Sequence, residues 1–389
     1  MPDGTDPQTE TGFDVEAHQR IADIGRTVWD SLAGTTDHPF VAYDFLEALE
    51  RSGSVAPNTG WGPHHLTLSK DGEIVGAMPL YAKGHSQGEY IFDHAWADAY
   101  ERAGGRYYPK LMSAVPFTPA TGPRLLAKDD ATRQLLAEAA IQWAAKTGLS
   151  SLHVNFPDPV QKELLKKAGY LIRTGQQFHF EDKGYGDWQG FLDALSSRKR
   201  KGLRKEREAI PAAGVEIEWL TGSDITEAVL DQFWVFYQDT GARKWGQPYL
   251  TRPFFSMITE TMADKLLFIM AKRNGKTIAG AMNVIGGDAL YGRYWGCTEY
   301  VPFLHFEVCY YQAVDFALAH GLTRVEAGAQ GEHKIARGYS PTPIYSGHWL
   351  ANSSFSEAVA RYLDAEENEV VDAIDYLSAF TPFKKNGQS

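Results

Sequence analysis

Apolar runs interrupted by a tight polar turn occur twice in the chain. The first pair of runs, 65–69 and 74–81, is separated by Lys70-Asp71-Gly72-Glu73. The second pair, 266–271 and 277–285, is separated by a turn that contains Asn274-Gly275. Such a pair of turn residues between two apolar runs is the strongest short-range sign of a β-hairpin. The pattern therefore predicts one hairpin in each half of the chain.

A helix-like apolar pattern that leads into a strand-like run also occurs twice. Residues 139–149 end in Gly148-Leu149 and precede the apolar run 151–156. Residues 311–322 end in Gly321-Leu322 and precede the run 324–327. Glycine just after the last helical residue is typical of a helix C-terminus. Both segments are therefore predicted to be a helix followed by a strand.

The hairpin and the helix–strand junction follow each other in the same order in both halves. Gly76-Ala77-Met78 and Gly280-Ala281-Met282 lie 204 residues apart, and Gly148 and Gly321 lie 173 residues apart. The matched order indicates a duplicated domain, with about 31 additional residues in the first copy, in the stretch 84–123. The alternative is that a hairpin, a helix and a strand recur by chance, because this arrangement is common in α/β proteins.

Helical periodicity is present outside these repeats as well. The apolar positions Val15, Ile21, Ile24, Val28, Trp29 and Leu32 predict an amphipathic helix that ends at Gly34. Residues 43–51 predict a second helix, and residues 355–380 predict two closing helices with acidic outer faces. We therefore expect a disordered acidic tail at 1–14, an N-terminal domain at 15–185, a basic connecting helix at 186–210 and a C-terminal domain at 211–389 that includes the closing helices.

The composition is that of a globular protein. The 389 residues include 43% apolar and 22% charged residues, with 38 Lys and Arg against 49 Asp and Glu, a net charge of −11. This length suits two domains. Cys297 and Cys309 are the only cysteines, so no disulfide framework is expected. No apolar run approaches the roughly 18–20 residues of a membrane span, and the N-terminus lacks a signal-peptide pattern, which predicts a cytoplasmic protein.

One local segment is strongly basic, although the chain as a whole has a negative net charge. Seven of the ten residues from 198 to 207 are basic: Arg198, Lys199, Arg200, Lys201, Arg204, Lys205 and Arg207. Arg198, Arg200, Lys201 and Arg204 are candidates to bind a polyphosphate or the backbone of tRNA. The alternative is a solvated helix face that pairs with acids of the closing helices.

The densest set of reactive side chains follows the predicted strand 324–327. It consists of Gln330, Glu332, His333, Lys334 and Arg337. Such a cluster can bind phosphate or carboxylate and transfer a proton. The alternative is a solvated loop with a local ion pair.

Two further groups of candidates lie in the second half. His305 and Glu307 precede the helix 309–319, where either could deprotonate an amine, although a helix-dipole acid and a packed histidine are the alternatives. Strand alternation would place Tyr291, Arg293 and Trp295 on one face, suited to an anionic or flat acyl donor. Core aromatics with a salt-bridged Arg293 are the alternative there.

Two other chemistries are disfavoured. Gly84-His85-Ser86-Gln87-Gly88 matches the G-x-S-x-G motif of hydrolases, but the following residues 89–96 make a poor helix, which that motif requires. The histidines have no metal-ligand spacing, so no metal site is expected.

Taken together, these segments resemble the tandem-GNAT Fem-type aminoacyltransferases of peptidoglycan cross-bridge synthesis. The resemblance is carried by 291–297, 311–317 and 321–328 in that order, and by the basic segment 197–207 followed by Ala213-Gly214-Val215. Segments 115–119, 121–124 and 328–334 are similar to a bacterial family of predicted N-acyltransferases, also described as peptidoglycan-biosynthesis-like.

The resemblance implies an α/β fold of two GNAT-like domains with mixed sheets, and transfer of an acyl or aminoacyl group to a small-molecule amine acceptor. It implies no tightly bound cofactor, with acyl-CoA or aminoacyl-tRNA as co-substrate and tRNA as an alternative partner. Glu307, His305 and His333 are then the candidate catalytic residues. The candidate substrate-binding residues are Asn283, Tyr291, Arg293, Gln330, Glu332, Lys334 and Arg337.

By the same resemblance, backbone N–H groups near Met282–Val284 would stabilise the oxyanion. The chain departs from the usual pattern because it has no Arg/Gln-x-x-Gly-x-Gly/Ala pyrophosphate loop. A Fem-like transferase that uses charged tRNA and a non-catalytic binding protein with this fold are the alternatives.

Overall fold

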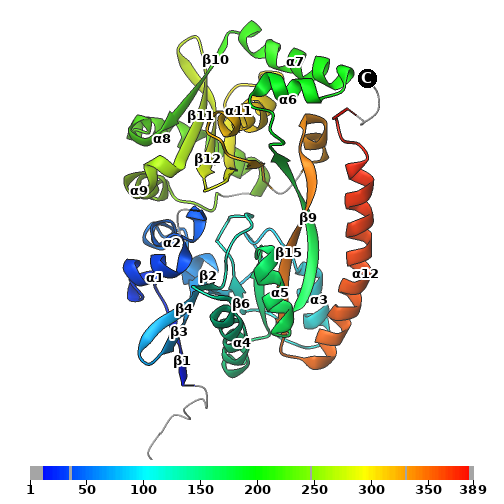
Figure 1. The fold of residues 1–389 in the computed structure, drawn as a ribbon. Coiled ribbons are helices and arrows are strands. Elements are labelled where there is room, and N and C mark those ends of the chain that lie inside the picture. The colour runs from blue at the N-terminus through cyan, green and yellow to red at the C-terminus, as the bar shows by residue number, and fades with distance from the viewer. Residues whose placement is uncertain (1–11, 35–36, 246–247, 329–330, 385–389) are drawn as a thin grey trace, which may run out of the picture. The chain divides into compact units, whose positions relative to one another are not determined.

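The computed structural model describes residues 12–34, 37–245, 248–328 and 331–384 (Figure 1). The chain divides into two compact units. Unit 1 comprises residues 1–35, 40–174 and 345–366, and unit 2 comprises 36–39, 175–344 and 367–389. The boundaries fall within strands β9 (Leu171–Glu181) and β15 (Ser340–Leu350) and within helix α12 (Ser353–Ser378).

In its described residues, unit 1 contains strands of two sheets, five complete α-helices and the first part of α12. The helices are α1 (Arg26–Ala33), α2 (Tyr43–Arg51), α3 (His94–Arg102), α4 (Asp130–Thr147) and α5 (Pro159–Lys167). The strands are β1 (Phe13–His18), β2 (Trp61–Pro63), β3 (His65–Lys70), β4 (Glu73–Met78), β5 (Tyr81–Lys83), β6 (Lys110–Ser113), β7 (Leu126–Ala127) and β8 (Ser151–Asn155).

In unit 1 one sheet has the order β1-β3-β4-β7, and the other contains β2-β5-β6-β8 with the unit 1 part of β15. Leu66, Leu68 and Met78 of the first sheet form a core with Leu136 and Ala140 of α4. The pairing of β6 with β8 is parallel and is three residues long. The core contacts show that the apolar face of α4 covers the hairpin formed by β3 and β4.

Unit 2 is built around the strands β10 (Val215–Thr221), β11 (Leu266–Arg273), β12 (Lys276–Ile285), β13 (Ala289–Cys297) and β14 (Arg324–Glu326), followed by the unit 2 part of β9. Its helical elements are α6 (Trp188–Ala194), α7 (Ser197–Ala212), α8 (Glu227–Trp245), α9 (Arg252–Met262), α10 (Leu304–Phe306), the π-helical turn η6 (Glu307–Tyr311), α11 (Gln312–Ala319) and the 3₁₀ helix η7 (Glu332–Arg337).

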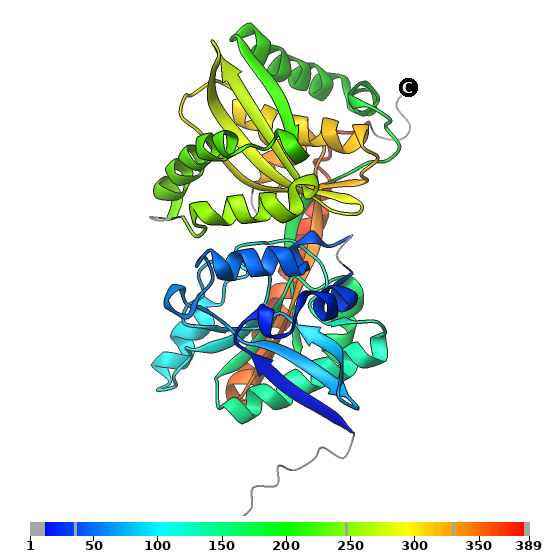
Figure 2. The ribbon, with the colours of Figure 1, turned by 90° about the vertical axis from the view of Figure 1, so that its left-hand side faces the viewer.

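Helices cover both faces of this sheet (Figure 2). Phe268 of β11 packs against Phe233 of α8, with ring centroids 5.0 Å apart. The alternate residues Leu267 and Ile269 belong to a core cluster that also contains Val314 of α11. Gly296 lets α8 approach closely, because a Cβ atom at this position would lie 2.1 Å from the carbonyl oxygen of Phe236.

Both predicted hairpins are confirmed. β3 and β4 turn at Asp71-Gly72, and β11 and β12 turn at Asn274-Gly275, with positive φ at all four residues. In each unit the hairpin is followed by a strand, a helix ended by a left-handed glycine, and a parallel strand: β6, α4 and β8 in unit 1, and β13, α11 and β14 in unit 2. The protein has the predicted fold of two duplicated GNAT-like domains with mixed sheets.

Two helix predictions are wrong. Residues 13–18 form strand β1, paired with β3, so only 26–33 of the predicted first helix is α-helical. Pairing along the edge of β3 outweighs the helical spacing of Val15 and Ile21. The C-terminal segment is one helix of 26 residues rather than two. Phe13 and Asp14, which composition assigns to the tail, begin β1, and residues 1–11 lie outside the described residues.

Candidate functional site

A β-bulge reshapes β13 next to the predicted site. Met282 of β12 is opposite Tyr294, but the next residue, Asn283, is opposite Gly292, which leaves Arg293 as the extra residue. Tyr291 and Tyr294 therefore share one face of the strand, and Trp295 lies on the other. The prediction that Tyr291, Arg293 and Trp295 share one face is wrong. The extra residue at the bulge reverses the alternation of side chains between the two faces for the residues that follow it.

The strands β13 and β14 separate soon after they pair. Their parallel pairing covers Ala289–Tyr291 and Arg324–Glu326, while β13 continues to Cys297. In the described part of the chain, residues 292–297 thus have a strand neighbour only on the β12 side. β12 pairs with β11 and β13 on its two sides, and the bulge interrupts its pairing with β13 between Met282 and Asn283. That oxyanion donors lie near Met282–Val284 stays a prediction.

Glu307 opens the helical segment that links β13 to β14. It starts a five-residue π-helical turn, a rare geometry that occurs mostly at functional sites. The side chain is buried, with 3% of its surface exposed. Oε1 accepts a hydrogen bond of 2.6 Å from Gln312 and lies 3.3 Å from Nε of Arg207. Oε2 has no hydrogen-bond partner among the described residues.

The surroundings of Glu307 make it a stronger base than an ordinary glutamate. Burial raises its pKa, and Arg207 and Gln312 offset part of that shift. Arg207 is itself fixed, because it forms an ion pair with Asp315 and its guanidinium lies 4.4 Å from the centre of the Trp188 ring. The carboxylate is thus oriented through Oε1, while Oε2 is buried and has no hydrogen-bond partner among the described residues.

A second polar group stands beside this carboxylate. Glu206, next to Arg207 on α7, accepts hydrogen bonds from Tyr311 and from Arg337, the latter at 2.8 and 3.0 Å. The Arg337 guanidinium lies 3.4 Å from the centre of the Phe306 ring. These contacts hold η7 against α7 and η6 within unit 2.

His333 and His305 lie on the same side of this cluster. His333 Nε2 is 2.9 Å from the hydroxyl of Tyr310. The His305 ring contacts Trp295 and Tyr310 at 5.1 and 5.3 Å, and its centre is 6.4 Å from that of His333. Burial, Arg337 and Lys334 lower the pKa of His333. His333 is therefore neutral at pH 7 and able to accept a proton.

The other predicted residues have different surroundings. Lys334 is buried, donates to the carbonyl of Gly328 at 2.7 Å, and has a pKa lowered by burial to about 8. Asn283 is buried on β12, and its Nδ2 is 3.4 Å from the carbonyl of Leu267. Glu332 is exposed. Gln330 lies outside the described residues.

The ring contacts bring His305, His333 and Arg337 together through Phe306 and Tyr310. Glu307 is linked to this group through Arg207 and its neighbour Glu206, which accepts hydrogen bonds from Arg337. Tyr291 is not in this group, because it lies on the opposite face from Trp295 and interacts with Arg324. Sequence reasoning did not assign the roles of Glu206, Arg207, Tyr310 and Trp188. Glu206 is an acidic residue within the basic run. This was the one sign in the sequence that α7 buries part of that face.

The basic run divides between two sides of α7. Arg207 faces the cluster, and Arg200 pairs with Asp193 at 3.1 Å. Arg204 donates to Gln189 at 3.1 Å and is exposed, like Arg198 and Lys201. In the structure described, the acids that pair with this run are Asp193, Glu307 and Asp315, and none comes from α12.

Searches for other kinds of site gave no candidate in the described segments. No group of three or more His, Cys, Asp or Glu side chains there could hold a metal ion. Likewise, none of the helices described is both long enough and apolar enough to cross a membrane.

Comparison with known proteins identifies the class. Residues 20–385 match the FemAB-like family model, described as peptidoglycan biosynthesis/recognition, so the chain belongs to this family. The predicted resemblance is confirmed. No curated protein sequence matches the chain. Family and fold together define a transferase of the acyl or aminoacyl class.

Solved structures show the same fold. The crystal structure of FemX is 13% identical, with a TM-score of 0.51, over 82% of this chain and 94% of that one. The C-terminal domain of a putative lysylphosphatidylglycerol synthetase from Agrobacterium fabrum is 10% identical, with a TM-score of 0.54, over 87% and 95%. L-PGS from Bacillus licheniformis is 12% identical, with a TM-score of 0.50, over 81% and 95%.

Proposed function

We propose that the protein transfers an aminoacyl group from charged tRNA to the amine of a peptidoglycan precursor. The observation that carries the proposal is Glu307, a buried carboxylate with one oxygen fixed by Gln312 and Arg207 and the other without a hydrogen-bond partner in the described structure. An attacking amine must lose a proton, and a base of raised pKa is suited to take it.

Each side chain of the cluster then has one task. Glu307 accepts the amine proton, and Arg207 orients Glu307. His333, neutral at pH 7, passes the proton toward solvent or positions the acceptor together with His305. Arg337 and Arg293 bind anionic parts of the substrates, and backbone N–H groups at the edge of β13 that faces away from β12 hydrogen-bond to the developing oxyanion. The new amide bond forms as the ester bond to the tRNA breaks, and the terminal hydroxyl of the tRNA leaves with a proton, so no covalent intermediate with the protein is needed.

The basic helix favours tRNA over acyl-CoA as the donor. Arg198, Lys201, Arg204 and Lys205 are exposed on α7, and a row of exposed cations on a chain of net charge −11 fits a nucleic-acid backbone. The segment between β13 and α10 contains Pro302 and a left-handed Phe303, whereas a pyrophosphate is usually held by a glycine-rich loop. We expect the protein to act in the cytoplasm, where charged tRNA is present.

The test is a transfer assay with two donors. Aminoacyl-tRNA labelled in its aminoacyl group and a labelled acyl-CoA are each mixed with the protein and an amine-bearing peptidoglycan precursor. We expect label to move to the precursor from aminoacyl-tRNA and not from acyl-CoA. Transfer from acyl-CoA alone would contradict the choice of donor, and transfer from neither would contradict the proposed function.

A further inference from the structure

An exposed tryptophan is hydrogen-bonded to a residue that orients Glu307. Trp219 lies on β10, which is the edge strand of the sheet in unit 2, and 36% of its surface is exposed. Its indole Nε1 donates a hydrogen bond of 2.8 Å to Oε1 of Gln312. Nε2 of Gln312 in turn donates the hydrogen bond of 2.6 Å to Oε1 of Glu307. Two hydrogen bonds thus join an exposed side chain to the buried carboxylate.

The chemistry of the two partners determines how the Gln312 amide is turned. An indole N–H can only donate a hydrogen bond, and an ionised carboxylate can only accept one. If the amide were turned over, its oxygen would face the Glu307 carboxylate and its NH₂ group would face the N–H of Trp219. Both hydrogen bonds would then be lost. Trp219 therefore selects the amide orientation that stabilises the ionised form of Glu307.

The indole ring is itself held in place by α11. It packs edge to face against Phe316, with ring centroids 5.3 Å apart and an angle of 76°. Phe316 follows Gln312 by four residues, so the two side chains lie on the same face of the helix. The His320 ring, at the end of α11, lies 6.3 Å from the indole. Packing along this face of α11 thus fixes the indole N–H beside Gln312.

Gln312 is one of several groups that act on the charge of Glu307. Burial raises the pKa of Glu307, Arg207 on α7 and Gln312 offset part of that shift, and Asp315 on α11 adds to it. Arg207 contacts the same carboxylate oxygen as Gln312, at 3.3 Å. Turning the Gln312 amide over would remove one of the two stabilising contacts. The pKa of Glu307 would then rise further.

We propose that Trp219 is a positioning residue of the transfer site, which keeps the Gln312 amide turned toward Glu307 and so keeps the carboxylate oriented and ionised. Trp219 acts through Gln312 rather than on the substrates. This inference rests on the proposed function, since it concerns the base that the proposed function assigns.

The experiment titrates the Glu307 carboxyl directly, by NMR of the full chain labelled with carbon isotope at the side-chain carboxyl of glutamate. The Glu307 signal is identified by its absence in Glu307→Gln. Trp219→Phe keeps an aromatic ring against Phe316 and removes the N–H. We expect it to move the midpoint of the Glu307 titration to higher pH.

A double-mutant cycle tests whether Trp219 acts through Gln312. Gln312→Leu removes the amide, so it should move the Glu307 midpoint in the same direction as Trp219→Phe. In the Gln312→Leu background Trp219→Phe should have no further effect, because there is no amide left to orient. An unchanged midpoint in Trp219→Phe, or an equal shift with and without Gln312, would overturn the inference.

A second replacement separates the lost donor from lost packing. Benzothienylalanine in place of Trp219 keeps the shape of the indole but has sulfur where the indole has its N–H. It should give the same shift of the Glu307 midpoint as Trp219→Phe. A wild-type midpoint with this analogue would show that packing, and not the hydrogen bond, is what matters, and would overturn the inference.

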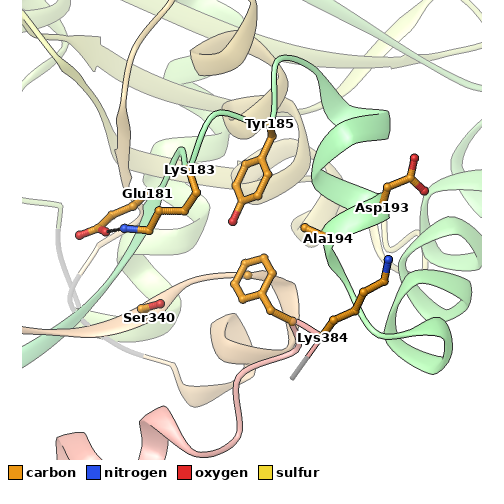
Figure 3. Close-up of a pocket in the computed structure, with 9 residues that line it drawn as sticks. Glu181, Lys183, Tyr185, Asp193, Ala194, Ser340 and Lys384 are labelled. Carbon is orange, nitrogen blue, oxygen red and sulfur yellow. Dashed lines mark hydrogen bonds and ion pairs between the residues drawn. The ribbon is translucent and has the colours of Figure 1, made fainter. Parts of the chain in front are cut away.

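A cavity of about 460 Å³, also in unit 2, provides the matched control (Figure 3). The Tyr185 ring projects into it, and Trp219, Gln312 and Glu307 are not among the residues that line it. Tyr185→Phe likewise keeps an aromatic ring and removes its polar group. It should leave the Glu307 midpoint unchanged, and a shift equal to that of Trp219→Phe would overturn the inference.

Failure of this inference is distinguishable from failure of the proposed function, because the titration needs no substrate. A shifted midpoint in Trp219→Phe without transfer in the two-donor assay would contradict the proposed function alone. Transfer by the wild type with an unshifted midpoint in Trp219→Phe would contradict the role of Trp219 alone. Where both hold, turnover of Trp219→Phe below the midpoint should be about tenfold lower, the effect of losing one hydrogen bond to a charged group.

Discussion

The two units place different side chains at the same point of a shared framework. In each, two strands pair in parallel over only three residues, β6 with β8 and β13 with β14. Near this point unit 1 holds buried charged groups that form ion pairs with one another, whereas unit 2 holds Glu307 and the exposed His333. Each unit has a buried glutamate oxygen here without a hydrogen-bond partner among the described residues, Glu89 Oε1 and Glu307 Oε2, so the difference is the exposed histidine of unit 2. The shared arrangement of strands determines where a site can form in each unit. The side chains at that place determine whether the site can be catalytic.

The buried network of unit 1 is centred on Lys110. Its Nζ donates to Ser86 Oγ at 2.8 Å, Glu89 Oε2 at 2.8 Å and Asp93 Oδ2 at 2.6 Å. Ser86 donates in turn to Asp93 at 2.5 Å. Ser86 belongs to the G-x-S-x-G motif, but no helix follows it until α3 begins at His94. The serine is thus a buried member of a charge network.

The largest expected effect comes from removing the central cation of that network. Lys110→Met would leave Glu89 and Asp93 buried without it, and breaking a buried ion pair in this way costs about 3–5 kcal/mol. Urea denaturation should show this loss, while Lys201→Met on the exposed side of α7 should change stability by less than about 0.5 kcal/mol. If Lys110→Met and Lys201→Met lowered the free energy of unfolding by the same amount, the claim that unit 1 depends on a buried charge network would be contradicted.

The network should also give unit 1 a pH dependence of its own. Burial raises the pKa of Glu89 to about 7, and Lys110 offsets part of the shift. The folded protein then keeps a proton that the unfolded chain loses near pH 4.3, so this group makes stability fall as pH rises toward 7. We expect Glu89→Gln to remove this decline between about pH 5 and 7. An unchanged slope in denaturation curves across that range would show that Glu89 is ionised in the folded state.

The helix ends offer a matched pair of smaller changes. Gly148 and Gly321 end α4 and α11 in left-handed conformations, with φ of +67° and +69°, and no atom lies within 4 Å of an added Cβ in either case. Alanine at each site should therefore cost about 1 kcal/mol from backbone conformation alone. Gly202→Ala inside α7 is the control and should stabilise by about 0.5–1 kcal/mol. Clearly unequal losses at 148 and 321 would show that the two helix ends are not equivalent.

The smallest effect on stability is expected on the outer side of α7. Lys201→Glu combined with Lys205→Glu should change the free energy of unfolding by less than about 0.5 kcal/mol, since both side chains are exposed. The same protein should elute from heparin at lower salt, because polyanion binding depends on the number of cations. A large loss of stability would favour a structural role for this face.

Local patterns were enough to predict much of the fold. Asp71-Gly72 and Asn274-Gly275 identify their hairpins, because few other residues adopt positive φ easily, and Gly148 and Gly321 mark helix ends for the same reason. Strand β1 could not be predicted, since its formation depends on pairing with β3, some 50 residues further along the chain.

The site was predictable only as a set of separate segments. Glu307 and His333 were identified by residue type, but the π-helical turn that orients Glu307 has no sequence signature. The bulge at Arg293 likewise depends on register with β12 and reverses the face of Trp295. Arg207 looked like one cation in a run, and only the packing of α7 against η6 and α11 shows that it pairs with Glu307 and Asp315.

The most direct test of the central claim, that unit 2 carries the chemistry through Glu307, is the pH dependence of transfer turnover in the wild type and in Glu307→Gln. For the wild type we predict turnover that falls as the pH drops through the raised pKa of Glu307, because the base must be ionised. For Glu307→Gln we predict a loss of about 10²–10⁴-fold and no such acid limb, while Glu216→Gln, an exposed change on β10, should match the wild type. Near wild-type turnover with the acid limb retained in Glu307→Gln would contradict the account.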